Sequence, residues 1–191
     1  MRIEASAKSG SKSDSTRRKP RFTNKMVAFA STGIACPLAW GFLMNAFGGV
    51  APSAQLPWTL SYLVLAVAVL IFAAISRKAP AFFSSGVSAT IAGTLGAFGS
   101  LLLALTLTIF PSTPLQFAAM VLCACVLGWL YLQWSTFYAK LDLRHAVIYL
   151  RLANIGGSTL KAITHFIPIE AQCASAMLLP VISVSMCWIA L

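Results

Sequence analysis

The amino-acid sequence predicts an all-α fold, a polytopic membrane protein built as a bundle of transmembrane helices. Hydrophobic residues make up 59% of the 191 residues and charged residues only 9%, whereas soluble domains contain about 45 to 50% apolar and about 25% charged residues. The mean hydropathy is +0.83, and a chain with so few charges cannot cover a globule with polar surface. The apolar runs are continuous rather than alternating, which excludes a membrane β-barrel.

Six apolar runs account for most of the chain, and a membrane-spanning helix needs about 20 mainly apolar residues. We predict spans over residues 26–47, 56–75, 81–110, 117–138, 146–167 and 171–191. The third run is longer than a straight span requires, so we expect it to tilt or to begin in the headgroup layer. Short connections make neighbouring helices antiparallel and keep them in one bundle. Because the last run continues to residue 191, we expect this bundle to be part of a longer chain.

The distribution of basic residues predicts the orientation in the membrane. Residues 1–25 hold eight of the fourteen Lys and Arg against two acidic residues, a net charge of +6 out of +10. This segment is rich in Ser and poor in large apolar residues, so we expect a disordered tail. The connections at 76–80 and 139–145 carry further Lys and Arg, whereas the alternate connections carry none. Cytoplasmic loops hold the excess of basic residues, so both termini are predicted to be cytoplasmic, with the tail as a topology signal. Binding of the basic tail to anionic lipid or nucleic acid is the less favoured alternative, and the favoured interpretation includes no direct nucleic-acid contact from this chain.

Small residues in the third run predict close packing of helices, because they let two helix backbones approach. They form two ridges, one of Ala89, Gly93 and Ala97 and the other of Gly96, Ser100 and Ala104. Pro37 in the first run and Pro180 in the last are predicted to kink their helices, since proline frees a backbone carbonyl.

The stretch RLANIGGSTLKAITHF, residues 151–166, is unexpectedly polar for a membrane span. At 100° per residue, five of its polar side chains fall within an arc of about 80° on one helix face. We call this set the polar stripe; it consists of Arg151, Asn154, Ser158, Lys161 and His165. An unpaired charge near the bilayer centre costs roughly 2.5 to 3.5 kcal/mol, so such residues usually face a bundle interior or a wet cavity.

Three interpretations of the polar stripe remain open. The stripe lines a cavity and binds an anionic small molecule, or it packs against a second bundle half or a second copy of the chain. Alternatively, residues 146–167 lie in the membrane interface as an amphipathic basic helix, which leaves only five crossings. Gly156 and Gly157, beside Asn154 and Ser158, are expected to weaken the helix and to open it locally.

The sequence contains no recognisable catalytic or metal-binding set. His145 and His165 are 20 residues apart, and the only acids outside the tail, Asp142 and Glu170, are predicted at opposite membrane faces. Asp142 is expected to balance Lys140 and Arg144. The cysteines Cys36, Cys123, Cys125, Cys173 and Cys187 all fall in apolar runs without a CxxC motif. We therefore expect no enzyme activity, no cofactor, no metal and no disulfide framework.

The stretches WSTFYAKLDLRHA (134–146) and HFIPIEAQCASAMLLPVISVSM (165–186), with a polar helix between them, resemble the membrane half of bacterial LuxR-type transcriptional regulators. In that family a major-facilitator-like helix bundle precedes a cytoplasmic helix-turn-helix domain. The resemblance implies the first six-helix half of a membrane-embedded sensor in the bacterial cytoplasmic (inner) membrane, and the DNA-binding domain has no counterpart here. The alternative is a half-unit of a small-molecule transporter or permease, against which the connection ISRKAP argues mildly, because it lacks the G-x-x-x-D-R-x-x-R-R pattern of major-facilitator transporters. A structural membrane protein without a ligand is a third, weaker option.

Overall fold

The computed structural model describes residues 24–50, 55–83, 85–139 and 141–190, which form seven helices. These are α1 (Asn24–Val50), α2 (Gln55–Lys78), α3 (Pro80–Phe83), α4 (Gly86–Thr108), α5 (Thr113–Tyr138), α6 (Leu143–His165) and α7 (Ile169–Ala190). The described ranges contain no strand, so the predicted all-α bundle is confirmed. The predicted disordered tail, residues 1–25, lies outside the described residues except for its last two.

Five of the six predicted spans each correspond to one long helix, whereas the third run, residues 81–110, is divided in two. Pro80 begins the short helix α3, as is common for proline in a first helical turn. Ser85 then caps α4, its side chain accepting a hydrogen bond of 3.2 Å from the backbone N–H of Ser88. The extra length of this run is therefore used by a separate helical turn rather than by a long tilted helix. Phe83 of that turn is buried, with its ring centroid 5.7 Å from that of Trp129 in α5.

Four stretches are long and apolar enough to cross a membrane, and they indicate a membrane protein. They are Leu60–Lys78, Gly86–Thr108, Thr113–Tyr138 and Glu170–Ile189. In α1 the apolar stretch among the residues searched, Ser31–Met44, is shorter, and α6 is not among the four. Large apolar side chains point outward from the bundle, as expected in lipid; Leu63 and Leu70 of α2, for example, are 60% and 70% exposed.

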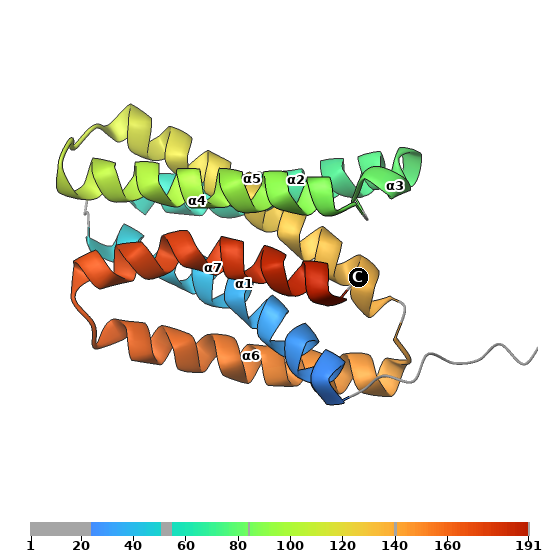
Figure 1. Ribbon diagram of the computed structural model, residues 1–191. Coiled ribbons are helices and arrows are strands. Elements are labelled where there is room, and N and C mark those ends of the chain that lie inside the picture. Colours follow the sequence, from blue (N-terminus) through green and yellow to red (C-terminus); the bar gives the residue numbers. More distant parts are fainter. Residues whose placement is uncertain (1–23, 51–54, 84, 140, 191) are drawn as a thin grey trace, which may run out of the picture.

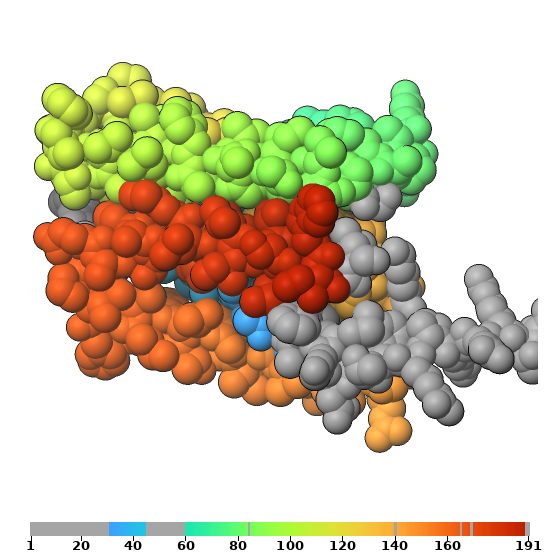
Figure 2. Space-filling model, in the orientation of Figure 1, coloured from blue at the N-terminus to red at the C-terminus, as the bar shows by residue number. Residues whose placement is uncertain are grey.

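The long helices form two groups of three (Figure 1). In one group α1 contacts both α6 and α7, and in the other α5 contacts both α2 and α4. The groups join where α4 packs against α7. Figure 2 shows this side of the bundle, on which the side chains of α7 fill the space between α4 and α6 and cover most of α1.

The set of packed helix pairs is the same for the two halves of the chain. Exchanging α1 with α5, α2 with α6, and α4 with α7 converts α1–α6 into α2–α5 and α1–α7 into α4–α5, and it leaves α4–α7 unchanged; these are the main packed pairs. The first three long helices and the last three therefore form two equivalent units. The middle helix of each unit packs against the other unit: α2 packs against α5, and α6 packs against α1. Because neighbouring helices run antiparallel and each unit has an odd number of them, the second unit is inverted relative to the first. Inverted three-helix repeats are known from transporter folds.

The described basic residues of the connections gather at one end of the bundle. The end of α2, the start of α4, the end of α5 and the start of α6 all lie there (Figure 1). Arg77, Lys78 and Arg144 are exposed at this end. At the opposite end the described connections, residues 109–112 and 166–168, contain no charged residue. The bundle thus has a charge difference along its long axis.

Two buried tryptophans connect the group of α1, α6 and α7 to the group of α2, α4 and α5 through hydrogen bonds to serines. The Trp40 indole N–H in α1 donates to Ser100 Oγ in α4 at 2.8 Å, and that of Trp134 in α5 donates to Ser183 Oγ in α7 at 3.1 Å. The Ser183 hydroxyl in turn donates to the carbonyl of Gly33 in α1 at 3.0 Å. Both indoles are 0% exposed. The exchange that relates the two units also relates these two bonds, so each unit is fastened in the same way.

The small residues of α4 meet α7 at close range. A Cβ atom at Gly93 would lie 2.9 Å from Val184 Cγ2, and one at Gly96 would lie 2.9 Å from Pro180 Cβ. Of the other ridge residues, Ala89, Ser100 and Ala104 are buried and Ala97 is half-buried. Pro180 therefore occupies space that the glycines leave free, and Pro37 is likewise fully buried inside α1.

Replacing Ser183 with Ala tests the serine–tryptophan fastening. Ser183→Ala leaves the buried Trp134 N–H without an acceptor, so we expect the free energy of unfolding to fall by about 1–3 kcal/mol. Thermal or chemical denaturation of the detergent-solubilised protein measures this change. Ser175→Ala is the matched control, because the exposed Ser175 hydroxyl donates only to Ala171 of its own helix; it should change the stability by less than about 0.5 kcal/mol. Equal effects of the two substitutions would show that the bond does not hold the two groups of helices together.

Candidate ligand-binding face

Helix α6 lies at the edge of the bundle and packs lengthwise against α1 (Figure 1). Its inward face repeats at three- and four-residue spacing, with Tyr149, Ala153, Gly157 and Thr164 buried. This periodicity is that of a regular helix with one face toward its neighbour. The remaining faces of α6 are open to the surroundings of the bundle.

The glycine pair of α6 lies at a close approach between α6 and α1. A Cβ atom at Gly157 would lie 3.0 Å from Leu38 Cβ and 3.3 Å from the carbonyl oxygen of Ala35, and one at Gly156 would lie 3.3 Å from Ala35 Cβ. The helix is continuous through both residues, so the expected local opening is absent. The lack of side chains instead allows two helix backbones to approach.

The polar stripe lies on an exposed flank of α6. Arg151, Asn154, Ser158 and Lys161 are all exposed, while the side chain of His165 lies outside the described residues. Asn154, the middle residue of the helix, donates from Nδ2 to the Leu150 carbonyl of its own helix at 2.9 Å. Among the described residues, Arg151, Ser158 and Lys161 have no hydrogen-bond or carboxylate partner.

Most outward-facing Ser and Thr hydroxyls elsewhere in the bundle, unlike that of Ser158, form a hydrogen bond within their own helix. They donate to a carbonyl three or four residues earlier in the same helix, at 2.8 to 3.0 Å, as seen for Thr90, Thr94, Thr159, Ser175 and Ser185. Such bonds satisfy a hydroxyl in a medium without water. Ser158 forms no such bond, so the stripe offers donors that its own helix leaves unused.

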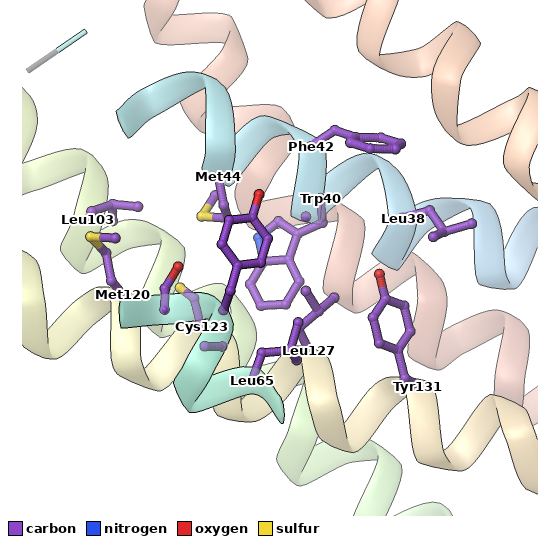
Figure 3. A pocket seen from close by; sticks show the side chains of 14 residues that line it. Leu38, Trp40, Phe42, Met44, Leu65, Leu103, Met120, Cys123, Leu127 and Tyr131 are labelled. Carbon is purple, nitrogen blue, oxygen red and sulfur yellow. The ribbon is translucent and has the colours of Figure 1, made fainter. Parts of the chain in front are cut away.

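A cavity of about 200 Å³ lies between α1, α2, α4 and α5. Figure 3 shows it, with Trp40, Leu65, Leu127 and Tyr131 from three different helices turned toward one space and the Phe42 ring turned away from it. Its wall is mainly apolar and includes Trp40, Met44, Leu65, Leu103, Met120 and Leu127. Polar side chains also border it, namely Ser61, Tyr62 and Tyr131. The sequence pattern did not indicate this cavity.

The cavity and the polar stripe share a wall on α1. Leu38 and Phe42, one turn apart, both line the cavity. Leu38 also lies beside Gly157 of α6, and Lys161 Nζ lies 5.1 Å from the centroid of the Phe42 ring, within cation–π range. The stripe and the cavity therefore belong to the same side of the bundle, which α1, α2, α5 and α6 form and which we call the open face.

The described charges of the open face are positive. Its cations are Arg151 and Lys161, whereas the described acids, Asp142 and Glu170, lie at the start of α6 and in the first turn of α7. Asp142 pairs with His145 rather than with the basic residues expected for it, and the hydrogen bond from His145 holds the pKa of the Asp142 carboxyl below its usual range. No group of three potential metal ligands occurs in the part of the chain that the structure describes. The open face thus suits an anion.

Replacing Gly157 with Leu tests the position of α6. Because a side chain there meets backbone atoms of α1, the two helices must separate, and we expect a loss of about 1–3 kcal/mol in the free energy of unfolding, the usual range for overpacking. Denaturation of the solubilised protein gives the value. Ala162→Leu adds a larger side chain on an exposed position of the same helix and should leave the stability nearly unchanged. If Gly157→Leu were equally silent, α6 would not pack on α1 as described.

Comparisons with known proteins give no relative from which a function can be read. No family model, no curated protein and no solved structure matches the chain. The geometry and chemistry of the open face are therefore the features that indicate a function.

Proposed function

We propose that all six long helices cross the cytoplasmic membrane of a bacterium, with both ends of the bundle's chain on the cytoplasmic side. Helix α6 runs alongside α1 (Figure 1), whereas an interfacial helix would lie across the end of a bundle. Helix α1 has 27 residues, and at 1.5 Å per residue it is long enough to span the hydrocarbon. The exposed Arg77, Lys78 and Arg144 at one end favour that end as the cytoplasmic one.

The open face is proposed to bind an anionic small molecule. Arg151 and Lys161 supply positive charge, Asn154 and Ser158 supply neutral polar groups, and His165 adds a charge when it is protonated. The observation that carries this proposal is the presence of two cations and an unused hydroxyl on an exposed flank of a membrane helix. Each unpaired charge costs roughly 2.5 to 3.5 kcal/mol at mid-membrane, and a bound anion offsets that cost.

A second six-helix unit is proposed to cover the open face. Polar and charged side chains at membrane depth normally face protein or a water-filled cavity rather than lipid. A second bundle half or a second copy of the chain would supply the missing wall and would place the polar stripe inside a chamber. The cavity interpretation and the packing interpretation of the stripe are then two aspects of one arrangement.

The leading role for such a chamber is the membrane-embedded sensor portion of a LuxR-type transcriptional regulator. The two stretches that carry this resemblance form the end of α5 with the start of α6, and most of α7, and they flank the polar stripe. A ligand that binds one packing of the helices better than another shifts the population toward it. A helix-turn-helix coding region that continues downstream of Leu191 would favour this role.

The alternative role is a half-unit of a small-molecule transporter. The inverted three-helix units favour it, because secondary transporters use such repeats around a site near mid-membrane. Uptake by the protein with its second unit in liposomes separates the two roles, since a sensor binds the ligand without moving it across the bilayer.

Cysteine labelling from one side of the membrane tests the path of α6. In a chain with Cys125→Ala, a membrane-impermeant maleimide applied to the outer face should label Glu170→Cys and leave His145→Cys unlabelled until the membrane is opened. Lys78→Cys and Ile109→Cys serve as controls for the inner and outer ends. Labelling of both test positions from the same side would mean that α6 does not cross, and only five helices would then span.

Charge-neutral substitutions test the anion site. We expect Arg151→Gln combined with Lys161→Gln to weaken anion binding by at least about tenfold, because each lost charged hydrogen bond contributes about 1.5–3 kcal/mol. Equilibrium dialysis or calorimetry in zwitterionic nanodiscs measures the affinity. Arg77→Gln with Lys78→Gln removes the same charge at the end of the bundle and should leave binding unchanged. Unchanged binding in the stripe variant, together with lost assembly, would make the stripe a packing surface only.

A further inference from the structure

We infer that the anion is amphipathic, with an apolar group held in the cavity between α1, α2, α4 and α5 and an acidic head beside Lys161. This inference rests on the proposed anion site and names its class of ligand: a small carboxylate or similar acid that carries one aromatic ring or a short alkyl chain. Two features of the open face carry it, the size and lining of the cavity and its shared wall with the polar stripe.

The cavity has the size and chemistry of a site for a small apolar group. Its volume of about 200 Å³ exceeds the roughly 150 Å³ of an engineered apolar cavity that binds benzene. Small residues keep it open, since Gly41 and Ala124 border it, and a Cβ atom at Gly41 would already lie 3.3 Å from Leu127 Cδ2. The Trp40 indole in its wall is fixed by the bond to Ser100. The same volume is too small for the two acyl chains of a phospholipid.

The position of the acidic head follows from the neighbours of Phe42. Phe42 is one of the residues that line the cavity, and its ring, which Figure 3 shows turned away from Leu65 and Leu127, lies 5.1 Å from the Lys161 ammonium. A short molecule that extends from the apolar space along the Phe42 side chain therefore reaches the charge. Arg151 lies ten residues earlier on α6, about 15 Å along the helix axis. One small molecule in the cavity therefore does not reach both cations, and Lys161 is the nearer partner. None of the described residues that line the cavity is charged, so the head remains at its rim.

Bromine-substituted probes test this assignment through Trp40. Bromine quenches tryptophan fluorescence on contact, so 4-bromophenylacetate bound as inferred should quench the protein in zwitterionic nanodiscs with a saturable dependence on concentration. Trp40→Phe should remove most of the saturable quenching. Ala124→Leu, which fills the cavity, should weaken the probe by at least about tenfold, whereas Ala74→Leu adds the same volume on the exposed side of α2 and should have no effect.

The charge requirement is tested with a matched neutral probe. Lys161→Gln should weaken 4-bromophenylacetate by at least about tenfold and leave the neutral 4-bromotoluene unaffected, while Arg151→Gln should have a smaller effect on the acid. Nanodiscs that contain an anionic phospholipid should not displace the probe. Displacement by that lipid would overturn the assignment to a small molecule.

The outcomes separate this inference from the proposed function. One outcome is that acetate displaces 4-bromophenylacetate, binds as tightly as that probe and loses affinity in Lys161→Gln. In that case the anion site stands and the amphipathic class of ligand is wrong. If the acid binds in the cavity without any dependence on Lys161, the assignment of the head is wrong. If no anion binds and the double stripe variant behaves as the native protein does, the proposed anion site itself fails.

Discussion

The structure depends on one constraint, the absence of water around most of its polar groups. In hydrocarbon each backbone or side-chain donor must find a partner within the protein. The helices satisfy their own backbone groups, the buried indoles of Trp40 and Trp134 donate to serines of other helices, and outward-facing threonines bond to their own helix. The glycines of α4 and α6 bring backbones into contact, because packing rather than a hydrophobic driving force holds helices together in lipid.

Against this background the polar stripe is the clearest exception. Arg151 and Ser158 have no hydrogen-bond partner among the described residues and Lys161 contacts only the Phe42 ring, whereas most outward-facing hydroxyls elsewhere form short local bonds. Gln116 and Gln133 each keep one buried side-chain atom without a partner, but both are neutral. Because two charged side chains and a hydroxyl have no hydrogen-bond partner among the described residues on one flank beside a cavity, we infer that a partner completes this flank. The positive charge of the flank indicates that an acid is part of that completion.

Much of the fold was predictable from the sequence, because hydrophobic length and helical periodicity are local properties. The six long runs, the small-residue ridge at Gly93 and Gly96 and the clustering of the polar stripe all come from spacing along one helix. The cavity was not predictable, since Leu38, Leu65 and Leu127 come from three helices and only their packing places them around one space. The glycine pair of α6 was misinterpreted for the same reason: the sequence shows a weakened helix, but not the α1 backbone that approaches it.

The position of the cavity also explains how an occupant would affect the whole bundle. Its walls come from α1 on one side and from α2, α4 and α5 on the other, so they belong to the two groups of helices that Figure 1 shows. These groups are joined tightly at α4 and α7, where glycines meet Pro180 and Val184, and only loosely between α1 and α5. A molecule in the cavity would therefore change the separation between α1 and α5, where the two groups pack loosely, while the α4–α7 contact stays fixed. Helix α6 packs against α1 at Gly157, so a shift of α1 would move α6 and its polar stripe as well. This contact couples the apolar site to the charged one. Such coupling suits either a sensor or a transporter.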